Sequence, residues 1–136
     1  KILIDGDKTV AAFGYKNELA QVIINILNNA KDEIEKKGEN QNIIIKISKS
    51  DKCALIEIED HAGGIDEAII DKIFEQYFST KTDEKGTGIG LYMSKMIIED
   101  GMNGKIEARN KKDEFGNNIG AIFTIKLPKE DSIICK

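Results

Sequence analysis

The sequence contains no tryptophan, one proline, one histidine and two cysteines among its 136 residues. Cys53 and Cys135 have no cysteine partner at the CxxC spacing, and His61 is the single histidine, so a zinc site is not expected. Cys53 lies in an apolar run and is expected to be an ordinary buried residue, whereas Cys135, next to the last residue, is expected to be frayed. This cysteine usage weakly favours a reducing cytoplasm.

Long hydrophobic runs and blocks of one charge are missing as well. No apolar stretch reaches the roughly 18–20 residues that a membrane helix needs, and the start carries no signal-peptide pattern. Lys and Arg number 20 and Asp and Glu 24, which gives a net charge of -4 with the two signs interspersed. Because nucleic-acid binding usually shows as a basic patch, a nucleic-acid surface is not expected.

The length of 136 residues is that of a single domain, with enough chain to bury a core without disulfides or metals. The chain begins with Lys1 and not with methionine, so we expect a fragment of a longer protein. Whether that protein is anchored to a membrane stays open.

One long segment has the apolar spacing of an amphipathic helix. Residues 17–37 are expected to form it, with Asn17 as the cap and Gly38 at the end. Its buried face is predicted to contain Leu19, Val22, Ile23, Ile26, Leu27, Ala30 and Ile34.

Two shorter helices are expected further along the chain. Residues 66–76 predict a short helix capped by Asp66, and residues 89–100 predict an amphipathic helix that ends at Gly101. The polar, glycine-containing stretch 77–88 between them predicts a mobile loop.

Four segments have the composition of strands. Residues 42–49 and 53–60 predict one hairpin, and residues 105–110 and 119–127 predict a second antiparallel pair. Residues 2–13 predict short edge strands or an irregular lead-in. Because most adjacent strands are linked by hairpins, we predict an α/β fold: a two-layer sandwich whose mixed, mostly antiparallel sheet is covered on one face by helices.

Asn25 and Asn29 lie four residues apart on the long helix, and Gln21 and Asp32 extend the same face. Asparagine is a mediocre helix former and is costly to bury without partners. One interpretation is a solvated polar stripe. The other is a cavity lined by amides, in which an asparagine oxygen is a hard ligand suited to Mg²⁺.

Asp60 ends a predicted strand and is followed closely by Gly63 and Gly64. Glycines let a backbone approach a flat ligand, and a carboxylate there can accept a hydrogen bond from an exocyclic amine such as that of adenine. The simpler interpretation is an Asp-Gly turn before a helix, which this segment alone does not exclude.

A GxGxG run of Gly86, Gly88 and Gly90 leads directly into the predicted helix at 89–100. Backbone N–H groups at a helix start, with glycines that remove steric bulk, form an anion site. The run does not match the GxGxxG of dinucleotide-binding folds, and the GxxxxGK[ST] of P-loop proteins is absent.

Taken in this order and spacing, the three elements are similar to those of the GHKL superfamily, and within it to the ATP-binding catalytic domain (HATPase_c) of sensor histidine kinases. The resemblance runs from about residue 15 to residue 128, so residues 1–136 are interpreted as one such domain without its helical and sensor domains. The matching motifs are QVIINILNNAKDE (21–33) for the N box, EDHAGGID (59–66) for the first glycine box, IFEQYFSTK (73–81) for the F box and the start of the ATP lid, and GTGIGL (86–91) for the second glycine box.

The resemblance implies a site for ATP and Mg²⁺, with Asn25 and Asn29 as catalytic residues. Asn29 would coordinate the Mg²⁺ that bridges the phosphates, with Asn25 and Asp32 on the phosphate side. Asp60 would read the adenine amino group, and Gly64 would let the ring approach. The other implied nucleotide-binding residues are Ala62, Ile65, Lys81, Gly86, Thr87, Gly88, Ile89, Gly90 and Leu91.

Some positions carry further expectations from the same resemblance. Phe74, Tyr77 and Phe78 are expected to anchor the lid with their apolar sides down, which is compatible with plain core packing. Ala62 stands where the family usually has glycine, which is tolerated if the local φ is negative, and Asn103 replaces another glycine.

In the gyrase, mismatch-repair and heat-shock chaperone branches, a glutamate one turn before the metal-binding asparagine activates water. That position here is Asn25, and an amide cannot take a proton, so hydrolysis is expected to be poor. The γ-phosphate would pass instead to a histidine on the absent helical dimerisation domain, with a response regulator downstream. Because dimerisation lies in that domain, this chain is expected to be monomeric. It is also expected to be cytoplasmic. The alternatives are a nucleotide-binding pseudokinase module, a GHKL serine kinase or an ATPase.

Overall fold

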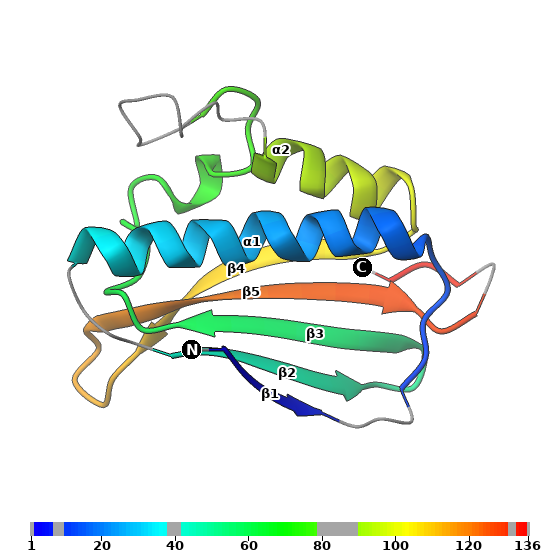
Figure 1. The fold of residues 1–136 in the computed structure, drawn as a ribbon, viewed down its shortest axis with the longest axis horizontal. Helices are drawn as coiled ribbons and strands as arrows, with labels where there is room; N and C mark the ends of the chain where they lie inside the picture. The colour runs from blue at the N-terminus through cyan, green and yellow to red at the C-terminus, as the bar shows by residue number, and fades with distance from the viewer. Residues whose placement is uncertain (1, 7–9, 38–41, 79–89, 131–132, 136) are drawn as a thin grey trace.

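The fold is a single sheet with all of its helices packed on one face (Figure 1). The computed structural model describes residues 2–6, 10–37, 42–78, 90–130 and 133–135. The sheet with its helices on one face confirms the predicted two-layer α/β sandwich. The elements are β1 (Ile2–Gly6), α1 (Lys16–Lys37), β2 (Ile43–Lys49), β3 (Cys53–Asp60), η1 (Ile70–Lys72), α2 (Gly90–Lys95), η2 (Met96–Asp100), β4 (Lys105–Lys112) and β5 (Asn118–Pro128).

The five strands run in the order β1-β2-β3-β5-β4, and only the β1–β2 pair is parallel. The central strand β3 pairs with β5 from Cys53 opposite Pro128 to Asp60 opposite Ala121. The lead-in contains both features expected of it. Its first part is the edge strand β1, and residues 10–13 are irregular, with the Phe13 N–H donating to the Pro128 carbonyl at 2.7 Å.

Alternation along the strands separates an apolar face from a charged one. In β3, Ile58 and Asp60 are buried on the face covered by α1, while Glu57 and Glu59 belong to the opposite face, where they contact charged residues of β4. Burying each large aliphatic side chain stabilises the fold by about 1.5–3 kcal/mol. The core consists of Val22, Ile26, Ala30, Ile43, Ile45, Ile58, Ile73, Ile98, Met102, Ile106, Ala121, Phe123, Ile125 and Leu127.

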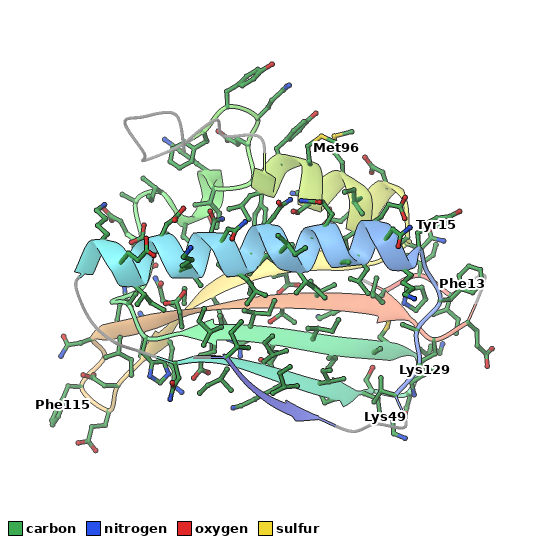
Figure 2. The ribbon with its side chains drawn as sticks, in the orientation of Figure 1. Phe13, Tyr15, Lys49, Met96, Phe115 and Lys129 are labelled. Atoms are coloured by element: carbon green, nitrogen blue, oxygen red, sulfur yellow. A yellow bond between two sulfur atoms is a disulfide. The ribbon has the colours of Figure 1, made fainter. Side chains whose placement is uncertain are left out.

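The long helix is confirmed, with a small change at its start. It begins at Lys16, so Asn17 is not its cap, and the Leu19 N–H donates to the Tyr15 carbonyl at 2.9 Å. Phe13 and Tyr15 lie exposed beside this start (Figure 2). Gly38 lies outside the described residues.

The predicted helix over residues 66–76 is wrong. Asp66 caps no helix: its Oδ1 accepts from the Ala68 N–H at 2.9 Å within a turn, and the N-cap of η1 is Ile69. Beyond it the chain forms the short 3₁₀ helix η1 and successive turns closed by i→i+3 hydrogen bonds, the last from the Phe78 N–H to the Glu75 carbonyl at 3.2 Å. These tighter turns let Ile73 enter the core while Phe74 and Phe78 pack against it.

The second amphipathic helix is confirmed over residues 90–100, as α2 followed without a break by the π turn η2. Its wider last turn is closed by the Gly101 N–H, which donates to the Met96 carbonyl at 3.2 Å. Residue 89 lies outside the described residues.

A disulfide joins Cys53 and Cys135 across 82 residues of sequence, so the expectations of an ordinary buried Cys53 and a frayed Cys135 are wrong. Cys135 is 2% exposed, and its N–H donates to the Asn103 carbonyl at 2.8 Å. The strand register contributes to the meeting, because it places the end of β5 at Pro128 opposite Cys53. The disulfide removes the support that cysteine usage gave to a reducing compartment.

Candidate functional site

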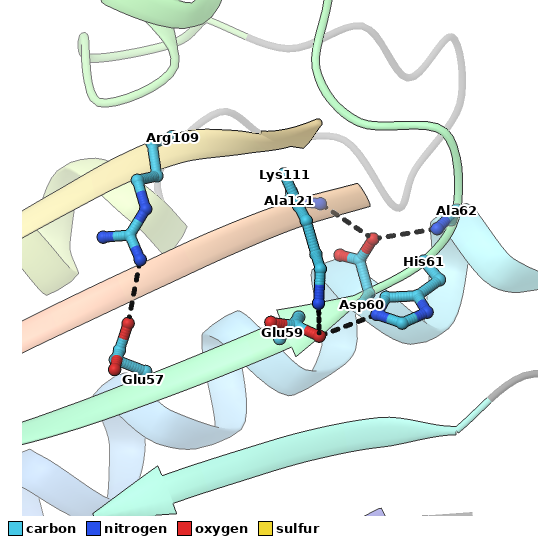
Figure 3. A network of polar contacts seen from close by, with 8 residues as sticks. All are labelled: Glu57, Glu59, Asp60, His61, Ala62, Arg109, Lys111 and Ala121. Atoms are coloured by element: carbon cyan, nitrogen blue, oxygen red, sulfur yellow. Dashed lines mark hydrogen bonds and ion pairs between the residues drawn. The ribbon is translucent and has the colours of Figure 1, made fainter. Parts of the chain in front are cut away.

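Asp60 is a buried carboxylate at the carboxyl end of β3, 6% exposed. Its Oδ1 accepts hydrogen bonds from the Ala62 N–H at 3.1 Å and the Ala121 N–H at 3.4 Å (Figure 3). Burial raises the pKa of Asp60, and these two amide bonds oppose the rise only in part. Because both bonds go to Oδ1, Oδ2 is the oxygen through which Asp60 can accept a hydrogen bond from a ligand.

The loop after Asp60 has the conformation that its glycines permit. Gly63 and Gly64 have φ values of 88° and 82°, whereas Ala62 is not among the residues with positive φ, so alanine is tolerated there as expected. A Cβ on Gly64 would lie 2.8 Å from the Asn110 Oδ1. Gly64 is therefore required both by its φ and by the closeness of β4.

Asn110 of β4 holds the loop that follows Asp60, and it was not among the predicted site residues. Its Oδ1 accepts from the Ile65 N–H at 2.6 Å, and its Nδ2 donates to the Ile65 carbonyl at 2.7 Å and to Glu67 Oε1 at 3.2 Å. The signal was present in the strand pattern, because Asn110 follows Ile106 and Ala108 in the inward-facing phase of β4. A polar residue in that phase needs a partner, and the partner is the backbone of the site.

Asn25 makes well-defined contacts between α1 and α2. Its Nδ2 donates to the Gly90 carbonyl at 3.3 Å and to the Ser94 Oγ at 3.2 Å, and its Oδ1 accepts from Gln21 Nε2 at 3.0 Å. The solvated-stripe interpretation therefore does not hold for Asn25. Asn29 and Asp32, further along the same helix, are half-buried.

Helix α1 connects the two ends of the predicted site. At one end Asn25 contacts Gly90, and at the other end Glu33 lies near enough to Asp60 to raise the pKa of that carboxyl further. From residue 25 to residue 33 the helix rises about 12 Å. Asn29 lies halfway, between the predicted phosphate end and the predicted adenine end.

Two residues of the second glycine box are described. Gly90 is the first residue of α2, and Leu91 is half-buried against the core. The predicted roles of Lys81, Gly86, Thr87, Gly88 and Ile89 lie outside the described residues and stay predictions.

A network of ion pairs covers the opposite face of β3 (Figure 3). Glu59 contacts Lys111 Nζ at 2.9 Å and His61 Nε2 at 2.7 Å, while Glu57 pairs with Arg109 at 3.0 Å. Burial alone would raise the pKa of Glu59, but hydrogen bonds and charge from His61 and Lys111 outweigh it and hold the pKa below its usual value. Strand alternation puts this network on the other side of the sheet from Asp60, so it is not part of the predicted nucleotide site.

The F-box aromatics divide into two groups. Phe74 and Phe78 pack against the core, and Phe74 meets Phe123 edge to face, with ring centroids 6.2 Å apart. Lys95 Nζ lies 5.9 Å from the centre of the Phe74 ring. Tyr77 is 69% exposed with φ of 65°, so the expectation that it is anchored apolar-side down is wrong.

A groove of about 320 Å³ lies along α2 and η2, and no predicted site residue lines it. Within the described part of the chain, no group of three or more His, Cys, Asp or Glu side chains is placed to hold a metal. The groove is lined by Phe74, Glu75, Tyr92, Lys95, Met96, Glu99 and Asp100, of which Figure 2 labels Met96.

Residues 14–131 match the protein family described as histidine kinase-, DNA gyrase B-, and HSP90-like ATPase. The chain belongs to this family. The predicted membership of the GHKL superfamily, with a histidine kinase ATP-binding domain, is thus confirmed.

Curated relatives within the family are sensor proteins. Sensor protein KdpD of Clostridium acetobutylicum is 39% identical over 116 residues, which are 82% of this chain and 12% of KdpD. Sensor protein ChvG of Agrobacterium fabrum is 28% identical over 123 residues, which are 88% of this chain and 20% of ChvG. The chain therefore spans a fifth or less of the length of these two relatives.

Solved structures of the family agree with the fold. The catalytic domain of histidine kinase ThkA is 31% identical with a TM-score of 0.77, over 95% of this chain and 78% of that one. ThkA in complex with the response regulator protein TrrA is 27% identical with a TM-score of 0.73, over 96% of this chain and 34% of that one.

Proposed function

We propose that this chain binds ATP with Mg²⁺ and donates the γ-phosphate to a histidine on the helical dimerisation domain of the same full-length protein, in two-component signal transduction. The observation that carries the proposal is the geometry of Asp60. Oδ1 of Asp60 is fixed by the backbone amides of Ala62 and Ala121, and Oδ2 is left for a ligand. The neighbouring loop has no side chain at Gly63 and Gly64.

Adenine is the base that fits this carboxylate. Its exocyclic amine donates a hydrogen bond, which an ionised Asp60 accepts. Guanine carries a carbonyl oxygen at the corresponding position, and two acceptors facing each other cannot pair. The site therefore favours ATP over GTP.

Asn29 is the residue that would hold Mg²⁺. A single amide oxygen fits this ion, because Mg²⁺ usually keeps several waters and binds through one or two protein ligands plus substrate phosphates. When bound, the ion neutralises charge on the phosphates. The place of Asn29 midway along the Asn25–Glu33 stretch of α1 supports this role.

A specific observation favours phosphotransfer over hydrolysis. Asn25 lies one turn before Asn29, and its amide can neither take a proton nor turn freely, because Gly90, Ser94 and Gln21 already bind it. No group at that position activates water. A neutral imidazole needs little help from a base, so positioning and charge neutralisation are enough for the transfer.

The proposal includes a partner domain and a downstream response regulator. The crystal structure of ThkA in complex with TrrA supports a response regulator as the downstream partner. In the described residues, no helix has both the length and the apolar character needed to cross a membrane. We propose that this domain works in the cytoplasm.

Titration calorimetry of ATP with and without Mg²⁺ tests the proposal, with GTP as the matched control ligand. We expect saturable ATP binding whose affinity falls when Mg²⁺ is removed and also falls in Asn29→Ala with Mg²⁺ present. The affinity for ATP should exceed that for GTP by at least about tenfold, which corresponds to one good hydrogen bond. The chain alone should release phosphate far more slowly than the roughly 1–100 s⁻¹ of kinases. Absence of binding at millimolar ATP would favour the pseudokinase alternative, and fast hydrolysis would favour the ATPase.

A further inference from the structure

Ser94 is a polar residue with no exposed surface, at a position where α2 packs on α1. Its hydroxyl donates to the Gly90 carbonyl at 2.8 Å and accepts from Asn25 Nδ2 at 3.2 Å. The same Nδ2 also donates to the Gly90 carbonyl at 3.3 Å. Ser94, Gly90 and Asn25 thus form a closed triangle of hydrogen bonds between the two helices.

The triangle uses the whole donor capacity of the Asn25 amide. Its two N–H bonds go to Ser94 and Gly90, and Gln21 donates to its oxygen. The side chain is therefore committed to the start of α2. An Asn25 that bound a phosphate directly would have to give up these bonds.

We propose that Ser94 is a positioning residue for the phosphate side of the nucleotide site. It fixes Gly90 against Asn25, and so sets the separation between the end of the glycine run and Asn29, one turn further along α1. Asn25 acts through the same triangle and not as a ligand of the phosphates. The inference rests on the proposed function of this site.

A purely structural role makes a different prediction. Alanine at position 94 removes one partner from Asn25 and from the Gly90 carbonyl, which still bond each other, so we expect a loss of stability that is compatible with folding. If Ser94 only stabilised the fold, its loss would weaken the binding of every ligand of the site equally. If it positions the phosphate side, binding of ATP suffers and binding of adenosine does not.

The decisive experiment is calorimetry of Ser94→Ala with Mg-ATP and with adenosine. We expect the Kd for Mg-ATP to rise about tenfold, as for the loss of a satisfied buried hydrogen bond, and the Kd for adenosine to stay within about twofold. Ser50→Ala is the matched control, because its hydroxyl bonds only the Cys53 backbone at the far end of β3, and both constants should stay unchanged. Equal changes for both ligands in Ser94→Ala, or none, overturn the inference.

Asn25→Ala provides a second test from the other side of the triangle, at a half-buried position. We expect it to weaken Mg-ATP binding about as much as Ser94→Ala, and the double variant to be no weaker than either single variant within about twofold, because all three break one triangle. Additive losses would assign Asn25 a direct contact with the phosphates and overturn the inference. A wild-type chain that binds no ATP would overturn the proposed function itself, so the two failures are distinguishable.

Discussion

The two ends of β3 are built in different ways. At the Cys53 end a covalent bond ties the strand to the last described part of the chain, and the Ser50 hydroxyl closes the hairpin turn. At the Asp60 end a carboxylate is buried beside two glycines in a left-handed conformation. The first end gains stability from its contacts, while the second holds a group that would be more stable in water.

The Asp60 end of β3 contains an energetically unfavourable group, and the Cys53 end does not. Burial raises the pKa of Asp60, which means that its ionised form is destabilised in the folded chain. The amides of Ala62 and Ala121 reduce this cost without removing it. The cost retained at the Asp60 end supports the proposal that this carboxyl binds a ligand.

The largest effect is expected at the Cys53 end. Reducing the Cys53–Cys135 disulfide should lower the free energy of unfolding by about 2–4 kcal/mol, because the crosslink closes a long loop in the unfolded chain. ATP affinity should stay within about twofold, since the bond lies at the far end of the strand from Asp60. Urea unfolding and calorimetry with and without reductant measure both, and a Cys53→Ser/Cys135→Ser variant should no longer respond to reductant. Loss of ATP binding in the folded, reduced chain would contradict the separation of the two ends.

The converse effect is expected at the Asp60 end. Asp60→Asn keeps an oxygen for the Ala62 and Ala121 amides but replaces the ligand-facing acceptor by a donor. We expect ATP affinity to fall about 100-fold, from the loss of a hydrogen bond to a charged group, while stability at pH 7 is unchanged or higher because a buried charge is gone. Calorimetry and urea unfolding of the same samples check the pair of outcomes. An Asp60→Asn variant that loses stability and keeps its affinity for ATP would make Asp60 a structural residue and not a ligand-binding one.

A smaller effect is expected from Asn110→Ala, which releases the loop at Ile65. Losing two short hydrogen bonds should lower the affinity for ATP and the affinity for adenosine about tenfold each, because the loop lies on the proposed adenine side. Asn118→Ala is the matched control, since its amide makes a single long bond to Glu67 at 3.4 Å. If the two variants bind alike, the loop does not depend on Asn110.

The smallest effect is a difference in pH dependence between neighbouring carboxyls. The folded pKa of Glu59 is lowered, so its stabilising contribution is present above the unfolded value and is lost as pH falls through the folded pKa. The folded pKa of Asp60 is raised, so its destabilising contribution is fully present above that pKa, declines as pH falls below it and is gone below the unfolded value. Urea unfolding between about pH 3 and 7 should show Glu59→Gln less stable than wild type at neutral pH, with the gap closing in acid. Asp60→Asn should show no such deficit.

Local pattern was enough to predict most of the fold. Periodicity located the long helix, the two hairpins and the second amphipathic helix, because each is defined by neighbours in sequence. The segment 66–76 was mistaken for a helix because its apolar spacing fits one, whereas the structure closes it with i→i+3 turns. The spacing of apolar residues alone does not distinguish an α-helix from a series of i→i+3 turns.

Three of the missed features are long-range contacts. Cys53 and Cys135 meet through strand register, Asn110 meets Ile65 across 45 residues, and Asn25 meets Ser94 across 69. Spacing along the chain carries no information about such pairs. Asp60 became a candidate from a local cue, at the end of a strand and before two glycines, and the family resemblance assigned it to adenine, which stays a prediction.

The Asn110 contact changes how the loop beside Asp60 opens. Asn110 offers Ile65 an acceptor and a donor, as a neighbouring strand would, so the Ile65 amide is bonded like an amide inside the sheet. In hydrogen exchange it should report the opening of the β4 edge and not the looser motions of a surface turn. If adenine binds beside this loop as we propose, its entry and release should be coupled to the opening of the β4 edge.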